Sequence, residues 1–303
     1  MSEPQRSART ITWQRRRASA AAFWHEFTTN KGGLVGLGLL ALIVLLSVLA
    51  PWFIDEAALD VTKATGTPLQ APSWDYPLGT DVDGRSVLLM TFWGARVSLL
   101  VGFAATVLSV FIGTLVGIAA AHFGGWVSGL LLRFTDFFLV LPSLVLAMAL
   151  SAVLPRGIMT IIVAVGVTSW PTTARLVRAQ TLTIESRPYI ERARALGGGH
   201  PHIIGTHVLP AVMPLVLANT TLVVGNSIIA ESTLSFLGLG DPNAISWGSM
   251  LQTALSSGAV TANAWWYILP PGLAIVVIVL SFTLVGRALE MVLNPRLKQG
   301  GRA

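Results

Sequence analysis

The chain is poor in charged residues and contains no cysteine. Of its 303 residues, 11% are charged and 53% are hydrophobic, whereas about a quarter of the residues in an average soluble domain are charged. Without cysteine the chain can form no disulfide, thiolate metal site or cysteine nucleophile, although this absence does not identify its compartment. The composition predicts a membrane protein.

Signatures of several other functions are missing as well. No Gly-x-x-x-x-Gly-Lys-[Ser/Thr] phosphate loop occurs, so ATP held by such a loop would have to be bound by another chain. The net charge is +6, but the basic residues are not gathered with aromatic residues on one surface, which argues against nucleic-acid binding. The segment from Asp81 to Gly84 is similar to the start of a calcium loop, but its twelfth position is Phe92 where an EF-hand has glutamate. We therefore expect neither a metal nor a cofactor on this chain.

Long hydrophobic runs, by contrast, are abundant. A helix needs about 20 mainly apolar residues to cross a bilayer, and six segments meet this length to within a few residues: 33–54, 97–121, 130–154, 157–174, 211–235 and 267–289. Pro142 is expected to kink the third segment. The first segment follows a polar stretch and shows no convincing cleavage site, so we interpret it as an uncleaved anchor. The sequence predicts an all-α membrane protein with six transmembrane helices.

Positively charged residues predict the orientation of these spans, because loops rich in lysine and arginine stay in the cytoplasm. They are concentrated in residues 1–32, 175–210 and 291–303, whereas the opposite loops carry more acidic than basic residues. We therefore expect both termini in the cytoplasm. The resulting organisation is a cytoplasmic tail (1–32), a first transmembrane helix (33–54), an extracytoplasmic loop (55–95), a core of five transmembrane helices (96–290) that includes the cytoplasmic segment 175–210, and a C-terminal cytoplasmic tail (291–303).

The segment 175–210 is a polar insert between two spans. Pro188 suits the first turn of a helix, and Gly197 suits the left-handed position just past a helix end. A helix this short is marginal alone, since isolated helices below about 12 residues are unstable in water. It is therefore expected to pack against something else.

Two further features of the insert follow from its sequence. Tyr189, Ala193 and Leu196 are spaced to form one apolar stripe on the first helix. A second short helix is expected from Pro201 to Pro210, which completes a helix-turn-helix protruding into the cytoplasm. Its three histidines lack a carboxylate to orient their rings, which is more typical of surface residues than of a zinc site.

Few charged residues lie within the spans. Arg133 and Asp136 are expected to pair along one helix, three residues apart. Glu231 could line a transport pathway, or it could pair within the helix bundle. A Gly-x-Gly-Asp sequence ends at Asp241, as in intramembrane aspartyl proteases, but its possible partner Asp136 is expected at the opposite depth of the bilayer, which argues against a dyad.

One stretch of the insert resembles the EAA loop of permease subunits of binding-protein-dependent ABC importers. The similarity is carried by Glu191-Arg-Ala193-x-x-x-Gly197 and, nine residues later, by His207-Val-Leu209-Pro210. The resemblance implies a type I importer permease fold in which the first helix docks on an ATP-binding subunit. It assigns docking to Glu191 and Ala193, with Tyr189 and Leu196 on the same helix. It assigns the turn to Gly197 and re-entry into the membrane to Leu209 and Pro210. Arg192 departs from the family, which usually has alanine there, so the choice of partner is left open.

Other stretches resemble the C-type permease subunit of dipeptide and oligopeptide importers. They are Pro77-Leu-Gly-Thr-Asp81-x-x-Gly84-Arg85, Gly94-Ala-Arg96-Val-Ser-Leu, Glu231-Ser-Thr-Leu-Ser-Phe-Leu-Gly-Leu-Gly240, Ser246-Trp-Gly248 and Asn294-Pro-Arg-Leu297. With the EAA loop they extend the similarity from about residue 30 to residue 298. The resemblance implies a non-catalytic subunit of the bacterial inner membrane that supplies half of a peptide pathway.

The same resemblance implies several partners. They are a second permease subunit, one or two ABC ATPase subunits that bind ATP and Mg²⁺, an extracytoplasmic substrate-binding protein and membrane lipid. Two alternatives remain open at this point: a permease of the same family for nickel chelates or another small solute, and a membrane scaffold that recruits a cytosolic protein without transporting anything.

Overall fold

The computed structural model describes residues 8–293, and its regular structure is helical throughout apart from one isolated bridge between Thr80 and Ser86. The helices are α1 (Ala8–Thr28), α2 (Lys31–Phe53), α3 (Val87–His122), α4 (Gly125–Val140), α5 (Ser143–Val153), α6 (Ile158–Glu185), α7 (Pro188–Ala195), α8 (His200–Ile203), α9 (Leu209–Phe236), α10 (Trp247–Ser256) and α11 (Trp265–Leu293). Short 3-10 turns cover Glu56–Leu59 and Val61–Lys63, and a π-helical turn covers Ile204–Val208.

Five helical stretches are long and apolar enough to cross a membrane, and a bent pair can supply a sixth span. The pair is α4 and α5, whose axes differ by 86°. Leu141 between them is extended, as expected for a residue before proline, and Pro142 cannot continue the hydrogen bonding of α4. The expected six-span all-α architecture is therefore confirmed, with a sharp break where a kink was predicted.

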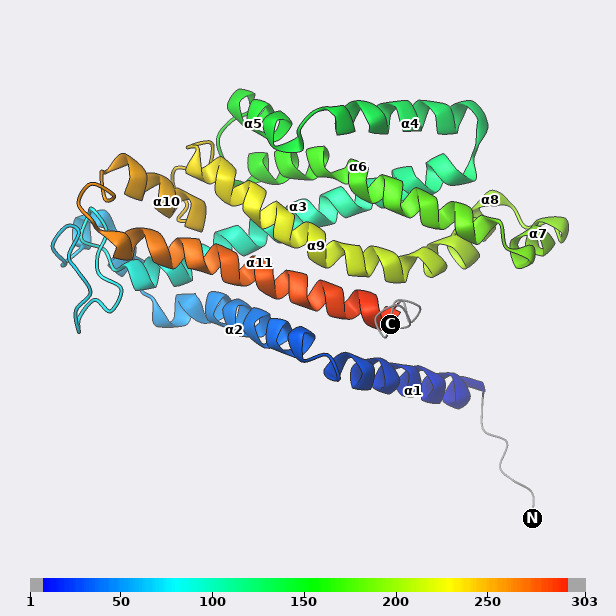
Figure 1. The fold of residues 1–303 in the computed structure, drawn as a ribbon, viewed down its shortest axis with the longest axis horizontal. Helices are drawn as coiled ribbons and strands as arrows, with labels where there is room; N and C mark the ends of the chain where they lie inside the picture. The colour runs from blue at the N-terminus through cyan, green and yellow to red at the C-terminus, as the bar shows by residue number, and fades with distance from the viewer. Residues whose placement is uncertain (1–7, 294–303) are drawn as a thin grey trace, which may run out of the picture.

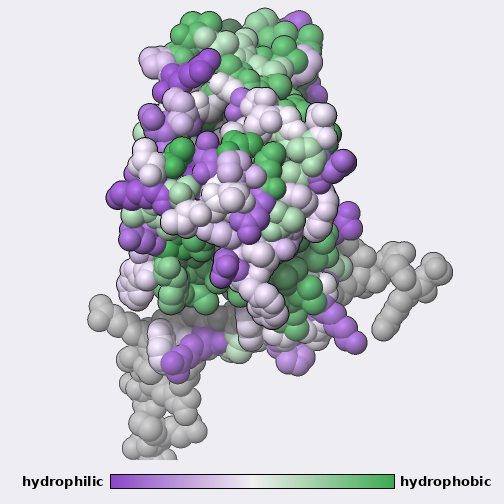
Figure 2. All heavy atoms as spheres, turned by 90° about the vertical axis from the view of Figure 1, so that its left-hand side faces the viewer, coloured by the Kyte–Doolittle hydropathy of each residue, from purple (hydrophilic) through white to green (hydrophobic). Residues whose placement is uncertain are grey.

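The helices form an elongated bundle with two different ends (Figure 1). Residues 54–86 and α10 lie at one end, which we call the loop end, and α7 and α8 lie at the other, which we call the insert end. Helices α3, α6 and α9 pack on one another along the bundle, and α11 and α2 lie beside them. Seen from the loop end, hydrophobic side chains predominate at the top of the view, and hydrophilic and hydrophobic side chains are mixed over the middle of the surface (Figure 2).

Glycines allow α3 and α6 to approach closely. A Cβ atom at Gly113 would lie 2.8 Å from the carbonyl oxygen of Trp170, and one at Gly117 would lie 2.6 Å from that of Ala174. The Gly-xxx-Gly spacing therefore marks a true packing site here. The same spacing at Gly125 and Gly129 does not, because nothing lies within 4 Å of either position.

Several boundaries differ from those expected from the apolar runs. Helix α3 begins at Val87, not at residue 97, and α6 continues to Glu185, not to residue 174. The tail 1–32 contains α1, and the insert 175–210 begins inside α6. The early part of α3 is mostly apolar but is followed by Arg96, so it was not counted with the span, whereas α6 continues into polar sequence where neighbouring helices pack against it. The C-terminal tail from residue 294 lies outside the described residues.

Candidate coupling site

The insert end carries the short hairpin predicted from the sequence. Helix α7 starts at Pro188, and its chain turns at Gly197, whose φ is +85°. The N–H of Gly198 donates to the carbonyl oxygen of Ala193 at 2.9 Å, and that of Gly197 donates to Arg194 at 3.0 Å. These two bonds form a Schellman cap, which requires a left-handed residue at position 197 and is best served by glycine. The predicted role of Gly197 in the turn has a clear geometric basis.

Buried isoleucines hold the hairpin on the bundle. Ile190 of α7 is completely buried and Ile203 of α8 is 1% exposed. Both belong to an apolar cluster with Ile184 of α6 and Val212 of α9. The short helix is thus stabilised by the spans next to it, as its length requires. Ile190 was missed by the sequence analysis because it lies beside, not within, the stripe chosen there.

The predicted apolar stripe of α7 faces outward. Leu196 is 89% exposed and Tyr189 is 39% exposed, while Ala193 is half-buried. Glu191 and Arg192 are exposed too. Leu196 and Tyr189 therefore leave apolar surface exposed at the tip of a charged hairpin. The long side chain of Arg192 points away from the hairpin's own core, so the usual alanine can be replaced here without disturbing the fold of the loop.

A polar junction ties the hairpin to two spans. One carboxylate oxygen of Glu185, at the end of α6, lies 2.7 Å from Nη2 of Arg194 on α7. The other lies 2.5 Å from Nδ1 of His122 at the end of α3. Nε2 of His122 is in turn 2.8 Å from Nδ1 of His200 on α8. Four helices therefore meet around one carboxylate that is only 11% exposed.

The junction has a defined direction of hydrogen bonding. An ionised carboxylate only accepts, so Nδ1 of His122 carries a hydrogen that it donates to Glu185. Nε2 of His122 and Nδ1 of His200 share a second hydrogen bond, whose donor is set by the tautomers of the two rings. The sequence analysis missed His122 and Glu185 because 63 residues separate them, and no local pattern indicates that the ends of α3 and α6 meet.

The second arm of the hairpin is continuous with a span. Helix α8 passes through the π-helical turn Ile204–Val208 directly into α9. The N–H of Leu209 donates to the carbonyl of Ile204, five residues back, which widens the helix just before Pro210. A proline ring collides with the carbonyl four residues before it, and a π turn relieves this collision. Leu209 and Pro210 lie where the hairpin joins the span, and no loop separates the two.

Glu231 lies on α9 near the loop end and is fully buried. Ser235 and Ser232 donate hydrogen bonds to its carboxylate at 2.8 and 3.2 Å. Ser98 of α3 and Ser246, which precedes α10, lie near this carboxylate. This is the arrangement expected if Glu231 pairs within the helix bundle.

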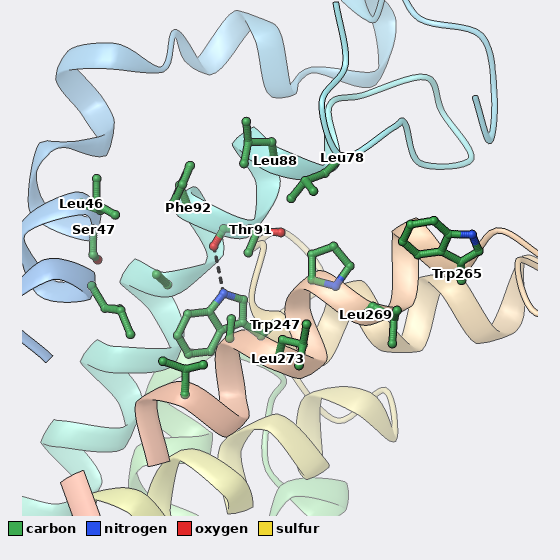
Figure 3. Close-up of a pocket in the computed structure, with 15 residues that line it drawn as sticks. Leu46, Ser47, Leu78, Leu88, Thr91, Phe92, Trp247, Trp265, Leu269 and Leu273 are labelled. Carbon is green, nitrogen blue, oxygen red and sulfur yellow. Dashed lines mark hydrogen bonds between the residues drawn. The ribbon is translucent and has the colours of Figure 1, made fainter. Parts of the chain in front are cut away.

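Three of the motif stretches meet around Glu231 and Trp247. The indole Nε1 of Trp247 donates to the carbonyl of Thr91 at 2.9 Å (Figure 3). A Cβ atom at Gly248 would lie 2.3 Å from the carbonyl oxygen of Ser232, so the close approach of α10 to α9 at this position requires glycine. Beside Trp247 lies an apolar cavity of about 410 Å³ between α2, α3 and α11. These contacts join α3, α9 and α10 at the loop end.

The turn at Asp81 is structural. The buried Asp81 carboxylate accepts hydrogen bonds from the backbone N–H groups of Asp83 and Arg85 and from the Arg85 guanidinium at 2.8 Å. Residues 81–85, which are similar in sequence to the start of a calcium loop, thus form a turn that is stabilised by a buried ion pair.

The expected pairing of Arg133 with Asp136 is wrong. Asp136 of α4 forms its ion pair with Arg175 of α6, at 2.6 Å, where both side chains are more than half exposed. The packing of α4 on α6 brings these residues together, which spacing along one helix cannot reveal.

Two family profiles match the sequence. Residues 109–299 match the binding-protein-dependent transport system inner membrane component. Residues 20–72 match the N-terminal TM domain of oligopeptide transport permease C.

Curated relatives cover nearly the whole chain. The oligopeptide transport system permease protein OppC of Bacillus subtilis (strain 168) is 35% identical over 277 residues, which cover 90% of this chain and 88% of that protein. The di/tripeptide transport system permease protein DppC of Pseudomonas aeruginosa (strain UCBPP-PA14) is 36% identical over 281 residues, covering 91% and 92%. Among solved structures, a chain of the inward-facing MetNI methionine ABC transporter matches with a TM-score of 0.55 and 20% identity, over 68% of this chain and 97% of that chain. The last similarity concerns the fold alone.

Proposed function

Because this chain belongs to the family of binding-protein-dependent transport system inner membrane components, we propose that it is the C-type permease subunit of an ATP-driven importer of dipeptides or oligopeptides. It is a transport subunit and not an enzyme. It forms half of a translocation pathway and couples that pathway to ATPase subunits. The observation that carries the proposal is the exposed hairpin of α7 and α8, which is fixed to three spans on one side and presents Leu196 on the other.

The peptide cargo is supported by the relatives. Those named above are permeases of oligopeptide and di/tripeptide systems, and the match includes the N-terminal TM domain of oligopeptide transport permease C. A permease for nickel chelates or another small solute remains the alternative within the family. A membrane scaffold that recruits a cytosolic protein is the alternative from another class.

The roles of the hairpin residues follow from their positions. Glu191, Arg192 and Ala193, with Tyr189 and Leu196, form the docking face for an ATPase. Gly197 makes the turn, and Leu209 and Pro210 transmit movement of the hairpin into α9. Coupling of this kind requires the open and closed states of the pathway to differ in free energy when the hairpin is displaced.

The remaining partners complete the assembly. A second permease subunit forms the other half of the pathway, one or two ATPases bind ATP and Mg²⁺, and a substrate-binding protein docks at the loop end. This chain itself binds no cofactor. The insert end and both termini lie in the cytoplasm of a bacterium, and the bundle spans the inner membrane.

Copurification and uptake test the proposal together. The chain, purified in mild detergent, is expected to bring with it a second permease, an ATPase and a binding protein. The same complex in proteoliposomes is expected to accumulate labelled alanine peptides of two to five residues when ATP is enclosed with the ATPase subunits. Accumulation of nickel chelates in place of peptides would contradict the cargo, and copurification of unrelated cytosolic proteins alone would contradict transport.

Charge reversal tests the docking face. Glu191→Lys is expected to abolish substrate-stimulated ATP hydrolysis in the assembled complex while leaving the chain inserted in the membrane. Arg133→Glu, on α4 and outside the hairpin, is the matched control and is expected to retain stimulation. Equal hydrolysis in Glu191→Lys and the unmodified complex would overturn the assignment of α7 to coupling.

A further inference from the structure

A second cavity lies at the break between α4 and α5. It has a volume of about 340 Å³ and is bounded by the break itself and by facing turns of α6 and α9. Its position in the bilayer follows from Ser227 of α9, which lines it. Ser227 hydrogen-bonds to Thr106 of α3 within the membrane-spanning part of both helices. The cavity therefore lies inside the bundle region, well away from the coupling hairpin.

Polar groups without partners line this cavity. Ser143 from α5, Ser169 from α6 and Asn226 from α9 all lie on its wall. Among the residues that the structure describes, none hydrogen-bonds to the side chains of these three. A hydroxyl or amide at membrane depth is costly unless something hydrogen-bonds to it. These groups therefore need a ligand or water that the chain itself does not supply.

The backbone adds to this set. No side chain caps the first turn of α5, whose N-terminal residues Pro142 and Ser143 line the cavity. Non-helical backbone at membrane depth is tolerated where it is buried in protein or lines a water-filled space. Broken spans of transporters place such half-helix ends at their substrate sites.

The lining carries no charged side chain. Its polar members are hydroxyls and one primary amide, and the rest are apolar, such as Phe138 and Val223. An amide both donates and accepts, as a peptide bond does, and hydroxyls do the same. Such a wall can hydrogen-bond to any peptide main chain and gives no ionic preference to one side chain over another.

We propose that this cavity is a station on the translocation pathway where Asn226 and Ser169 hydrogen-bond to the main chain of the passing peptide. The inference rests on the proposed function, since it names the part of the pathway that the peptide touches. It replaces Glu231, which is buried elsewhere, as the candidate for the pathway lining on α9.

Single cysteines test whether the cavity is wet. The chain has no cysteine of its own, so Ser169→Cys and Asn226→Cys each give it one thiol. Val107→Cys is the control, because Val107 is 51% exposed and follows Thr106, which is bonded to Ser227. In the assembled complex in proteoliposomes, a charged methanethiosulfonate is expected to modify positions 169 and 226 at least about tenfold faster than position 107, since a thiol in hydrocarbon is not ionised. Addition of the alanine peptides used for uptake is expected to slow the reaction at 169 and 226 only.

Transport by a second variant tests recognition directly. Asn226→Leu removes the amide at similar size and is expected to lower peptide uptake about tenfold, the equivalent of one or two lost hydrogen bonds. ATP hydrolysis stimulated by the binding protein is expected to persist, because the hairpin is unchanged. Val107→Leu is expected to leave both unaltered.

The outcomes separate the two proposals. Uptake by the unmodified complex together with unreactive, unprotected cysteines at 169 and 226 would overturn this inference and leave the proposed function intact. Full uptake by Asn226→Leu would also overturn it. If the unmodified complex takes up no peptide, the proposed cargo is wrong, and the peptide assignment of the cavity is wrong with it.

Discussion

The two ion pairs that involve α6 differ in how far their side chains are exposed, and this difference indicates what each does. Glu185 is largely buried and also holds His122, whereas Asp136 and Arg175 are both more than half exposed. Exposed pairs contribute about 0–1 kcal/mol. A partly buried carboxylate whose partners lie on different helices fixes geometry more strongly, because its loss leaves two donors unpaired. Glu185 is therefore the better candidate for positioning the hairpin.

Neutralising each carboxylate tests this difference. Glu185→Gln is expected to lower substrate-stimulated ATP hydrolysis several-fold, since Arg194 and His122 lose their shared anion and α7 is less firmly held. Asp136→Asn, the matched control, is expected to change it little. Hydrolysis is measured in the assembled complex, with detergent-extracted yield as the check on folding. Equal losses in the two variants would contradict a special role for Glu185.

Gly197 and Gly205 allow a second comparison at the residue scale, because their backbone conformations differ. Gly197 has φ of +85°, whereas Gly205 lies in the π-helical turn, and neither has atoms within 4 Å of an added Cβ. Gly197→Ala is expected to destabilise the hairpin by about 1–2 kcal/mol through backbone strain alone. Gly205→Ala is expected to be neutral or stabilising, because alanine favours helix.

Limited proteolysis at the insert measures both glycine variants. Faster cleavage between α7 and α8 is expected in Gly197→Ala only, together with weaker stimulation of the ATPase. Slower cleavage in Gly197→Ala than in the unmodified chain would show that the left-handed turn is not needed.

At the scale of elements, α7 has one side that packs on the bundle and one side that is exposed to a partner. Ile190 is fully buried on the bundle side and Leu196 is 89% exposed on the other. Ile190→Ala is expected to loosen the helix at a cost of about 2–4 kcal/mol, as for other buried large-to-small changes. Leu196→Ala is expected to leave the fold unchanged and to weaken binding of the ATPase.

Hydrogen exchange and copurification distinguish the two variants. Faster exchange across α7 is expected in Ile190→Ala, and reduced recovery of the ATPase with unchanged exchange is expected in Leu196→Ala. Full recovery of the ATPase with Leu196→Ala would remove Leu196 from the docking face.

The helices could be predicted from sequence where contact with lipid requires apolar residues. The apolar runs gave the spans, Pro142 gave the break, and Pro188 with Gly197 gave the ends of the hairpin. The start of α3 at Val87 was missed because Arg96 interrupts its apolar sequence, and the extension of α6 to Glu185 was missed because packing against other helices stabilises its polar end. Helix α10 was missed because its ten residues are too few for a span.

The candidate site was predictable only in its local parts. The turn at Gly197 follows from neighbouring residues, whereas Glu185 with His122 and Asp136 with Arg175 are brought together by helix packing. Likewise, the full burial of Glu231 results from the packing of α9 against α3 and α10. Single-sequence patterns carry no information on such distant contacts.

At the scale of the whole molecule, the hairpin and the proposed pathway share one rigid connection. The continuous stretch from α8 through α9 runs from the insert end, past the cavity at Asn226, to Glu231 near the loop end. A helix of 28 residues such as α9 extends over about 42 Å at 1.5 Å per residue. Movement of the hairpin can therefore reach the cavity without an intervening loop, which is the kind of rigid element that coupling needs.

The distribution of charge makes a prediction about how the whole bundle lies in the membrane. Arginines are concentrated in the insert and near the N-terminus, and loops with excess positive charge remain in the cytoplasm. Trp74 at the loop end is fully exposed and Leu196 at the insert end is 89% exposed. Because the chain lacks cysteine, Trp74→Cys and Leu196→Cys each place one accessible thiol at one end. In spheroplasts, a membrane-impermeant maleimide is expected to label the Trp74→Cys variant directly and the Leu196→Cys variant only after permeabilisation. The reverse pattern would place the hairpin outside the cell, where no ATPase could reach it, and would refute the proposed coupling together with the orientation.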